Sequence, residues 1–513
     1  MNRFQQASSV PPLDERRCAL DYDLSSSRSE NGVGEPPNVL KNDAQALSSD
    51  TVLVDANELI AARARRAPTV TEPIVILGAG ISGLAASLAS GAPVYEAERH
   101  VGGVAASDSR DGFTFDRGIH ILQTSHPKVQ KLLDDSGVRL QERSRQAYIY
   151  SHGSFTAYPF QVNTAGLPLS LRIRCVWTFL TRRSNADPAN YEEWMNAKLG
   201  QGFADTFLIP YSEKFWTVHP REMTHEWTGN RVPQPSTLQV LRGALWSRQT
   251  RIGSNADFRY PSHAPGYGAI ADALSRRVSA IHRGHRAVRL DVARHTLHFD
   301  NGTSVAYKRL ISTIPLPELV RLCADAPEDV RHAATLLRTN SILVVNLGIG
   351  RPARNGWHWV HFPEKALSFF RISFPHNLAD NVTPPGMSSI SVEVAYSAER
   401  PVDRDTIVQR VIDDLIKVGL LERSDPIVFT STRDIRYAYC IHDFARKDAV
   451  RRVRHWMLQH DVVPTGRYGF WNYFWSHEAL MSGLQAGEKA AKELRGEAVF
   501  DKDTSDESWA DSA

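Results

Sequence analysis

The chain has 513 residues, 42% of them hydrophobic and 23% charged, which is the composition of a soluble globular protein large enough for two or three domains. Its formal net charge of +3 is too small to indicate a nucleic-acid-binding protein, and no basic run interleaved with aromatic residues occurs. No apolar stretch approaches the roughly 20 residues of a membrane-spanning helix, and the first residues lack the apolar core of a secretory signal. The four cysteines stand apart without zinc-binding spacing, so we expect a reduced, cytoplasmic protein without a bound metal.

Both ends of the chain have the composition of disordered segments. Residues 1–70 are rich in Ser, Pro, Asn and Asp, which predicts a disordered N-terminal extension. Residues 496–513 are acidic, and we expect them to form a loose tail.

A dinucleotide-binding pattern occupies residues 73–103. Residues 74–77 predict a buried parallel strand, and residues 81–90 have the small, apolar composition of a helix packed on a sheet. The G-x-G-x-x-G between them permits a tight turn, the approach of a pyrophosphate to the helix N-terminus and close packing of helix on strand. Residues 92–95 predict a second strand that ends in an acid, placed to accept hydrogen bonds from an adenosine ribose. The residues concerned are Gly78, Gly80, Ser82, Gly83 and Glu96.

This order of strand, glycines, helix, strand and acid favours a bound dinucleotide over a strand–turn–helix unit without a ligand. Gly102 and Gly103 follow the acid, and the pairing resembles the second signature of flavoproteins in the amine oxidase and glutathione reductase superfamily. The resemblance implies that the dinucleotide is FAD and not NAD.

The segments after this pattern change type along the chain. Residues 165–250 carry apolar side chains at three- and four-residue spacing, as in a bundle of amphipathic helices. Residues 278–315 predict strands joined by a turn at 300–302, and residues 341–397 predict an antiparallel sheet. The remaining predicted elements are a strand within 113–121 that breaks at Gly118, a helix at 406–419, a strand at 427–436 and a final helix at 479–494.

We therefore expect an α/β protein with a discontinuous Rossmann-like FAD-binding domain, interrupted by an inserted helical bundle and an inserted antiparallel sheet. The flavin would lie where the two insertions meet. The expected boundaries are 71–164, 255–335 and 430–495 for the FAD-binding domain, 165–254 for the helical bundle and 336–429 for the substrate-binding sheet.

Short motifs in the two insertions carry a closer resemblance. In this order they resemble the UDP-galactopyranose mutases, nearer their eukaryotic-type branch, over residues 73–492. The glycine motifs alone would not separate this family from the amine oxidases. The motifs are YPFQ at 158–161, EW at 193–194, GFAD at 202–205, PY at 210–211 with Lys214 and Trp216, RV at 231–232, NADFRYP at 255–261, FFR at 369–371, and GRYG at 466–469 with Trp471 and Tyr473.

A nucleotide-diphosphate sugar explains the charged residues of these motifs. A diphosphate calls for planar, permanently charged donors, and Arg371 and Arg467 are the candidates. Either arginine could instead be a structural cation–π or salt-bridge partner. The resemblance also places Arg231 and Asn255 near the sugar and the flavin, with a helix cap and a turn as their structural alternatives.

The aromatic residues suit the base and the sugar. Tyr158, Phe160 and Gln161 offer the stacking faces and the amide that a uracil requires, and Phe207 falls at the family's second stacking position. An aromatic residue in a helical stripe is otherwise a core residue. The resemblance implies that the sugar and phosphates are lined by Trp359, Tyr439 and Tyr473.

His120 in the sequence DRGIH corresponds to the family's loop histidine beside the flavin, and a purely structural histidine is the alternative. With Arg371 and Arg467 it completes the candidate catalytic set. Further candidate FAD contacts are Val104, Gly118, Val288 and Met481.

The chemistry that the resemblance implies is covalent catalysis without net redox change. Reduced FAD attacks the anomeric carbon of the sugar through N5 with loss of UDP, and the sugar ring opens and recloses between pyranose and furanose. The arginines would keep the diphosphate within reach for recombination. NADPH or another reductant would enter the same cleft, and the sequence leaves the oligomeric state open.

The chain departs from the family at three positions. Ile119 replaces a glycine of the flavin loop, and Ile lacks the backbone freedom of Gly. His361 replaces a tyrosine, and His477 replaces an asparagine, both at the expected sugar end. The sequence therefore indicates a nucleotide sugar that need not be UDP-galactose.

Two other functions fit part of the sequence. A net oxidoreductase of the amine oxidase or protoporphyrinogen oxidase type shares the flavin motifs but has no need of YPFQ or two diphosphate arginines. A protein that binds a nucleotide sugar without catalysis would keep the fold and lose the flavin.

Overall fold

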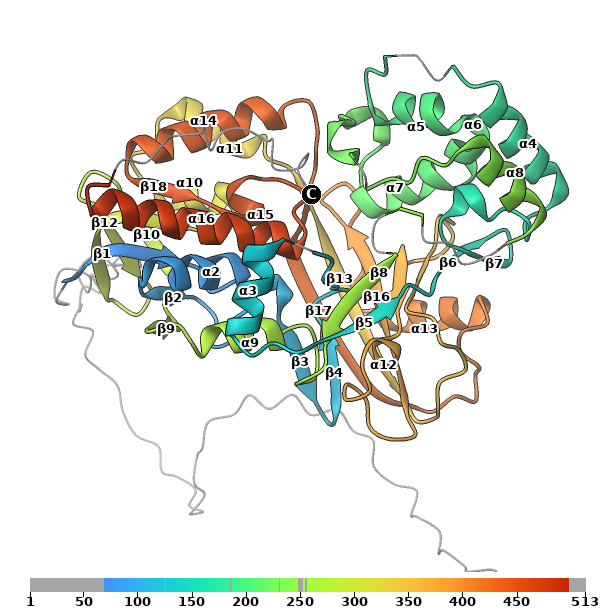
Figure 1. Cartoon of the computed structure of the whole chain (residues 1–513), viewed down its shortest axis with the longest axis horizontal. Helices are drawn as coiled ribbons and strands as arrows, with labels where there is room; N and C mark the ends of the chain where they lie inside the picture. The colour runs from blue at the N-terminus through green and yellow to red at the C-terminus, as the bar shows by residue number, and fades with distance from the viewer. Residues whose placement is uncertain are drawn as a thin grey trace, which may run out of the picture. The chain divides into compact units, whose positions relative to one another are not determined.

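The computed structural model describes residues 69–124, 126–183, 187–229, 231–247, 252–253 and 256–497, which form one compact unit (Figure 1). The predictions made for the N-terminal extension up to residue 68, for Asn255 and for the tail after residue 497 lie outside the described residues.

A largely parallel sheet carries the dinucleotide motif. Its central strand, β1 (Thr69–Leu77), is parallel to both of its neighbours, and the N-terminal part of the motif therefore lies in the middle of the sheet. The spatial order is β10 (Ala287–Asp291), β11 (Thr296–Phe299), β12 (Ser304–Ser312), β1, β2 (Val94–Glu96) and β9 (Ile281–Arg283), with β18 (Val462–Pro464) paired to β12.

Helices cover both faces of this sheet because the side chains of β1 alternate between them. Ile74 and Ile76 belong to one core cluster, whereas Val75 and Leu77 belong to the other. The first cluster includes residues of α2 (Ile81–Ser90), α3 (Pro127–Asp135), α9 (Ala269–Ser275) and α16 (Ser476–Leu494), and the second those of α10 (Leu316–Leu322), α11 (Glu328–Thr335) and α14 (Arg446–Gln459).

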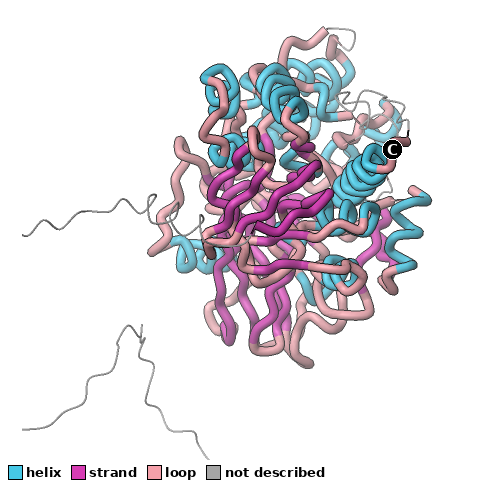
Figure 2. The backbone as a smooth tube through the Cα atoms, turned by 90° about the vertical axis from the view of Figure 1, so that its left-hand side faces the viewer, coloured by secondary structure: helices cyan, strands magenta, loops and turns pink. Residues whose placement is uncertain are grey.

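A second sheet of seven strands forms the inserted sheet. Its neighbours are antiparallel except for β6 and β14, which are parallel. Figure 2 shows strands of the unit running side by side with helices along their margins. The order is β17 (Ile427–Cys440), β13 (Thr339–Ile349), β16 (Ser388–Tyr396), β15 (Arg371–Ser373), β14 (Trp359–His361), β6 (Ala147–Ser151) and β7 (Ser154–Ala157), and α13 (Ile407–Lys417) packs on it.

The inserted helices lie between β7 and β8 in sequence. Several begin at local signals: the side chain of Asn190 accepts a hydrogen bond from the backbone N–H of Glu193, and Ser236 forms a capping box with Gln239. The helices are α4 (Leu169–Leu180), α5 (Tyr191–Leu199), α6 (Gln201–Phe203), the π-helical η3 (Ala204–Leu208), α7 (Ile209–Trp216), η4 (Pro220–Glu222), η5 (Glu226–Thr228) and α8 (Thr237–Leu245).

Short elements connect these parts. Two small antiparallel pairs occur, and no helix in the described part of the chain has the length and apolar character needed to cross a membrane. The elements are η1 (Gly103–Ala105), the pair β3 (Ser107–Arg110) and β4 (Phe113–Asp116), the pair β5 (Leu140–Ser144) and β8 (Asp257–Pro261), η2 (Phe160–Val162), α12 (Pro375–Leu378) and α15 (Gly466–Gly469).

The predicted α/β fold with its two insertions is present, but two segments lie in a different sheet from the one expected. The predicted FAD-binding domain includes residues 147–157 and 430–440, whereas β6, β7 and β17, which span these residues, belong to the second sheet. The reason is that these strands pair with residues far away in the sequence, which local patterns do not report.

Candidate active site

The glycine motif forms an open cradle at the start of α2. A Cβ atom on Gly83 would lie 1.9 Å from the carbonyl oxygen of Gly78, so this glycine allows the helix to pack on the strand. Gly78 itself has a φ of +99°, which favours glycine. A Cβ on Gly80 would meet nothing within 4 Å, because Gly80 faces a cavity of about 630 Å³. The cradle thus has room for a ligand at the glycine expected to face a pyrophosphate.

Glu96 closes the other side of this cavity. Its carboxylate accepts hydrogen bonds from the backbone N–H groups of Ala79, at 2.7 Å, and Glu98, at 2.8 Å. Burial raises the pKa of this carboxyl group, and the backbone hydrogen bonds oppose that shift. The carboxylate is thereby fixed beside the glycine turn, and its remaining lone pairs can accept from a ribose.

The predicted second signature lies in the same cavity. Gly102 and Gly103 have φ values of +103° and +56°, and Gly102 donates its N–H to the carbonyl of Ala79 at 2.8 Å. Ser82 and Val104 also line the cavity. The cradle, the acid and the glycine pair fit the adenosine and pyrophosphate of FAD.

Two predicted FAD contacts, Val288 and Met481, do not line the cavity at the glycine motif. Val288 lies on β10, and its neighbour Ala287 lines the cavity in its place. Met481 lines a separate cavity of about 1540 Å³, because α16 begins at Ser476 and runs along the face of α2. The helix starts three residues before the predicted position because the carboxylate of Glu478 accepts from the backbone N–H of Trp475 at 2.6 Å and closes the first turn.

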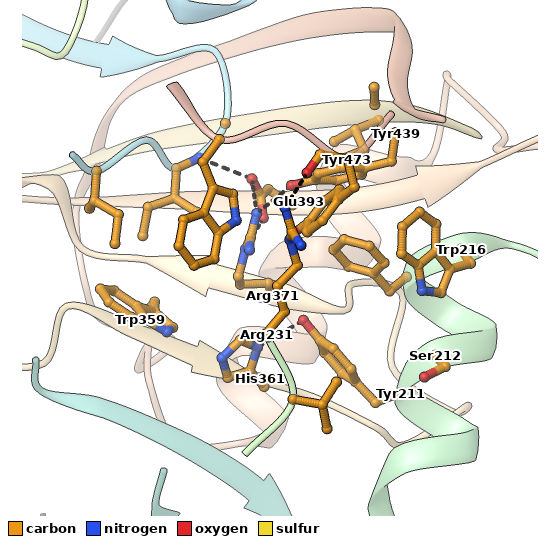
Figure 3. A pocket seen from close by; sticks show the side chains of 18 of the residues that line it. Tyr211, Ser212, Trp216, Arg231, Trp359, His361, Arg371, Glu393, Tyr439 and Tyr473 are labelled. Atoms are coloured by element: carbon orange, nitrogen blue, oxygen red, sulfur yellow. Dashed lines mark hydrogen bonds and ion pairs between the residues drawn. The ribbon is translucent and has the colours of Figure 1, made fainter. Parts of the chain in front are cut away.

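A second cavity of about 290 Å³ adjoins the first. The two share wall residues, so a flavin whose adenosine lies in the cradle would bring its ring toward the second cavity. The helical insertion forms one side of this cavity and the second sheet the other, as expected (Figure 3). The shared residues are Val104, Arg117, His120, Ile435, Arg467, Trp475 and Ser476.

A row of three polar side chains crosses the second sheet at this cavity. His361 on β14, Arg371 on β15 and Glu393 on β16 are register partners on adjacent antiparallel strands, so their side chains share one face. All three line the cavity, and Figure 3 shows aromatic side chains arranged around them.

Arg371 forms a two-point ion pair with Glu393. Its Nε and Nη2 both contact the carboxylate, and Nη2 also donates to the hydroxyl of Tyr439 at 3.1 Å. The side chains of Arg371 and Glu393 are 12% and 3% exposed. The salt bridge considered as the alternative role of Arg371 is therefore present, and Nη1 has no hydrogen bond to a described residue.

Glu393 also holds the flavin loop. Its carboxylate accepts the backbone N–H of Ile119 at 3.0 Å. Gly118 has a φ of +82°, and a Cβ there would lie 2.9 Å from the same carboxylate oxygen. Sequence analysis missed Glu393, although a lone acid within the apolar run of β16 was a usable signal.

Arg467 has a different environment. Its guanidinium donates to the backbone carbonyl of Phe474 at 2.6 Å and to that of Ala438 at 3.3 Å, and no described residue offers it a carboxylate. The ring of Tyr439 lies 5.7 Å away. An enclosed cation without a counter-ion favours the binding of an anion at the junction of the two cavities.

Arg231 is paired to the start of α16. It donates to Glu478 at 3.1 Å and to the carbonyl of Tyr473 at 3.1 Å, and it lies over the ring of Trp475. Its side chain lines the second cavity. Sequence analysis gave a contact at a helix end as the structural alternative for Arg231, and the structure contains such a contact.

His120 is a neutral histidine at the junction. Burial lowers its pKa to about 4, and the charges of Arg467 and Arg371 act in the same direction. Its Nδ1 lies 3.0 Å from the carbonyl of Gly118, which can only accept, so Nδ1 carries the proton and Nε2 is an acceptor. The imidazole stacks on Tyr267.

Three of the four expected uracil-binding residues line the cavity: Tyr158, Gln161 and Phe207. Phe160 lies behind them, fully buried, and stacks on Phe207 at a ring separation of 5.0 Å. Phe207 belongs to η3, and such π-helical turns are frequent at functional sites.

Of the tryptophan, two tyrosines and two histidines predicted to lie near the sugar and phosphates, four line the second cavity and one does not. Trp359, Tyr439 and Tyr473 line the cavity, as does His361, whose Nδ1 lies 2.8 Å from the hydroxyl of Tyr211. Burial lowers the pKa of His361 well below its ordinary value. His477 instead lines the separate cavity that contains Met481.

Sequence analysis also missed two basic residues of the cavity wall. Arg117 pairs with Glu98 and Asp108 and donates to the carbonyl of Gly103 at 3.1 Å. The guanidinium of Arg145 lies 4.7 Å from the ring centre of Tyr158. Arg117 lies within the DRGIH motif and could have been recognised from it, whereas Arg145 lies in no motif of the sequence analysis.

Residues 92–434 match the family of flavin containing amine oxidoreductases. The chain belongs to this family. Membership implies FAD as the cofactor, in agreement with the cradle.

A solved structure of reduced UDP-galactopyranose mutase superimposes with a TM-score of 0.78 and 26% identity, over 85% of this chain and 97% of that one. Two curated relatives match over short stretches. Protoporphyrinogen oxidase 2 of Arabidopsis thaliana is 34% identical over 16% of this chain, and coproporphyrinogen III oxidase of Propionibacterium freudenreichii is 32% identical over 21%. The chain matches only 18% and 21% of those relatives' own lengths.

Proposed function

We propose that this protein is a flavin-dependent mutase that interconverts the pyranose and furanose forms of a nucleotide-diphosphate sugar. The observation that carries the proposal is Arg467, an enclosed cation to which no residue in the described part of the chain offers a carboxylate, at the junction of the flavin cradle and an aromatic cavity. A diphosphate supplies the missing negative charge. The similarity to reduced UDP-galactopyranose mutase over nearly its whole length supports the proposal.

In this proposal the two arginines hold the diphosphate. Arg467 offers the uncompensated charge, and Arg371 offers Nη1 while Glu393 fixes the orientation of its guanidinium. Two fixed donors would keep UDP beside the sugar after the glycosidic bond has broken, which favours recombination over loss.

The base and the sugar fall on either side of these arginines. Tyr158 and Phe207 provide faces on which a uracil can stack, and Gln161 provides an amide for its edge. Toward the flavin, His120 presents an unprotonated Nε2 that can accept a proton from a sugar hydroxyl as the ring opens or closes. When bound in its reduced form, FAD would supply the N5 nucleophile that attacks the anomeric carbon.

A second candidate is a porphyrinogen oxidase, favoured by the two curated relatives. Their similarity covers about a fifth of each protein, whereas the mutase structure superimposes over 85% of this chain. We therefore retain oxidation of a porphyrinogen as the alternative.

Nucleotide binding separates the two candidates. We expect calorimetric titration of the FAD-loaded protein to show that UDP binds at least tenfold more tightly than uridine, because two charge-assisted hydrogen bonds depend on the diphosphate. Peroxide release in air with a porphyrinogen, together with no UDP binding, would instead support the oxidase.

A further inference from the structure

Two adjacent helices of the insertion expose large apolar side chains to the surroundings. Arg172 of α4 donates to the backbone carbonyl of Ala244 in α8, which fixes the two helices side by side (Figure 1). We call the following eight residues the apolar face: Leu169, Ile173, Trp177 and Leu180 of α4, with Leu238, Leu241, Leu245 and the following Trp246 of α8.

The spacing of these eight residues shows that each helix exposes one continuous apolar face. The α4 residues recur every three or four positions, so they form one row, and Leu238, Leu241 and Leu245 do the same on α8, with Trp246 directly after its last residue. Their exposed fractions run from 40% for Leu241 to 65% for Trp177 and Trp246. The opposite face of α4, with Cys175 and Phe179, is already buried in the helical core. The apolar face is therefore a second hydrophobic surface that the described fold leaves uncovered.

All charged residues within these helical segments are basic. Residues 165–183 contain four arginines and residues 232–251 contain three, and neither segment contains Asp or Glu. Asp205 of η3 neutralises Arg174, and the guanidinium groups of Arg172 and Arg182 donate to backbone carbonyls within the helical insertion. Arg183 and Arg242 are exposed beside the apolar rows.

The basic charge beside the apolar face indicates which partner can cover it. A second copy docked through the same face would bring arginines against arginines, and like charges oppose such an interface. A negatively charged lipid surface complements the arginines and accepts the leucines, while tryptophans prefer the level of the lipid headgroups.

We propose that the apolar face docks the protein on the surface of an anionic membrane. The helices α4 and α8 lie in the plane of the interface, with Trp177 and Trp246 inserted among the headgroups and the exposed Arg183 and Arg242 against lipid phosphates. This inference is independent of the reaction catalysed.

Vesicle flotation with the full-length, FAD-loaded protein tests the proposal. Vesicles of phosphatidylcholine with 30% phosphatidylglycerol are compared with vesicles of phosphatidylcholine alone. We expect the protein to float with the anionic vesicles and at least tenfold less with the neutral ones. The double variant Trp177→Ser/Trp246→Ser should lower anionic-vesicle binding at least tenfold.

Val428→Ser is the matched control, because Val428 is 53% exposed but belongs to β17. It should leave vesicle binding unchanged, and unchanged flavin content would show that each variant is folded. Absence of binding to anionic vesicles, or equal binding by the double variant, would overturn the proposal. So would a dimer in light scattering that the double variant dissociates, because a second copy would then cover the face.

Discussion

The positive charges of Arg467 and Arg371 have different partners in the structure, and we therefore expect the two arginines to have different roles. Arg371 is held by the carboxylate of Glu393, whereas Arg467 donates to backbone carbonyls, lies beside the ring of Tyr439 and has no carboxylate partner among the described residues. The first is thus an oriented donor and the second an uncompensated charge.

We predict that Arg467→Lys weakens UDP binding by about tenfold to a hundredfold, since Lys keeps the charge but loses the planar fork. Calorimetric titration measures the change. Arg452→Lys is the control, because Arg452 is an exposed arginine paired with Asp329. Equal UDP affinities for the wild type and Arg467→Lys would contradict the assignment.

Glu393 carries a stability prediction. Glu393→Gln leaves Arg371 without a counter-charge in an enclosed site, so the free energy of unfolding should fall by about 3 kcal/mol. Urea denaturation of the FAD-loaded protein measures this value. Glu422→Gln removes the ion pair of an exposed residue with Arg354, and should change the free energy by less than about 1 kcal/mol. Similar losses in the two variants would show that Glu393 has no special role.

Among the helices and strands, sequence patterns predicted best those elements whose bounds depend on neighbouring residues. The bounds of α2 agree with the predicted 81–90, because glycines and small apolar residues specify that turn and helix by themselves. The strands predicted within 278–315 are also present, and the last of them, β12, runs from Ser304 to Ser312.

The pairing of strands could not be predicted in this way. The row formed by His361, Arg371 and Glu393 depends on the register of three strands, and β6 reaches the same sheet from far earlier in the chain. The ion pair of Arg371 follows from such non-local geometry. His477 differs from the prediction for another reason: it lies in the first turn of α16, in the wall of the separate cavity.

The start of α2 offers a test of the cradle. Gly80→Ala should leave the stability of the cofactor-free protein unchanged, because the new Cβ meets no protein atom and the φ of −67° suits alanine. FAD affinity should fall at least tenfold, since a methyl group would occupy the approach of the pyrophosphate. Flavin release during dialysis measures the affinity. Gly356→Ala, another open position, is the control, and full flavin retention by Gly80→Ala would refute the cradle.

For the whole molecule, buried histidines predict loss of stability in acid. Burial lowers the pKa values of His120, His358, His376 and His477 to about 4, below the ordinary value of 6.5. Between these values the unfolded chain binds more protons than the folded one, so stability falls as pH drops from 6.5 toward 4.

Asp116 acts in the opposite direction. Burial raises its pKa to about 6, so the folded state binds the extra proton between the ordinary value of 3.8 and that point. Burial also raises the pKa values of Glu96, Glu364 and Asp443, and it lowers those of His361 and His442. The histidines with lowered pKa values still outnumber the acids with raised ones. We therefore expect the thermal midpoint to decrease between pH 7 and pH 5 in a scanning calorimeter, and a constant or rising midpoint would contradict these pKa shifts.

The central claim is that the two cavities form one active site for a mutase. Its most direct test is anaerobic incubation of the dithionite-reduced protein with UDP-galactofuranose, with chromatography of the products and parallel recording of flavin absorbance. We predict many molecules of UDP-galactopyranose per flavin, no net flavin oxidation and no product from oxidised protein. Stoichiometric flavin oxidation, or no turnover of this or any other nucleotide sugar by the reduced protein, would contradict the account.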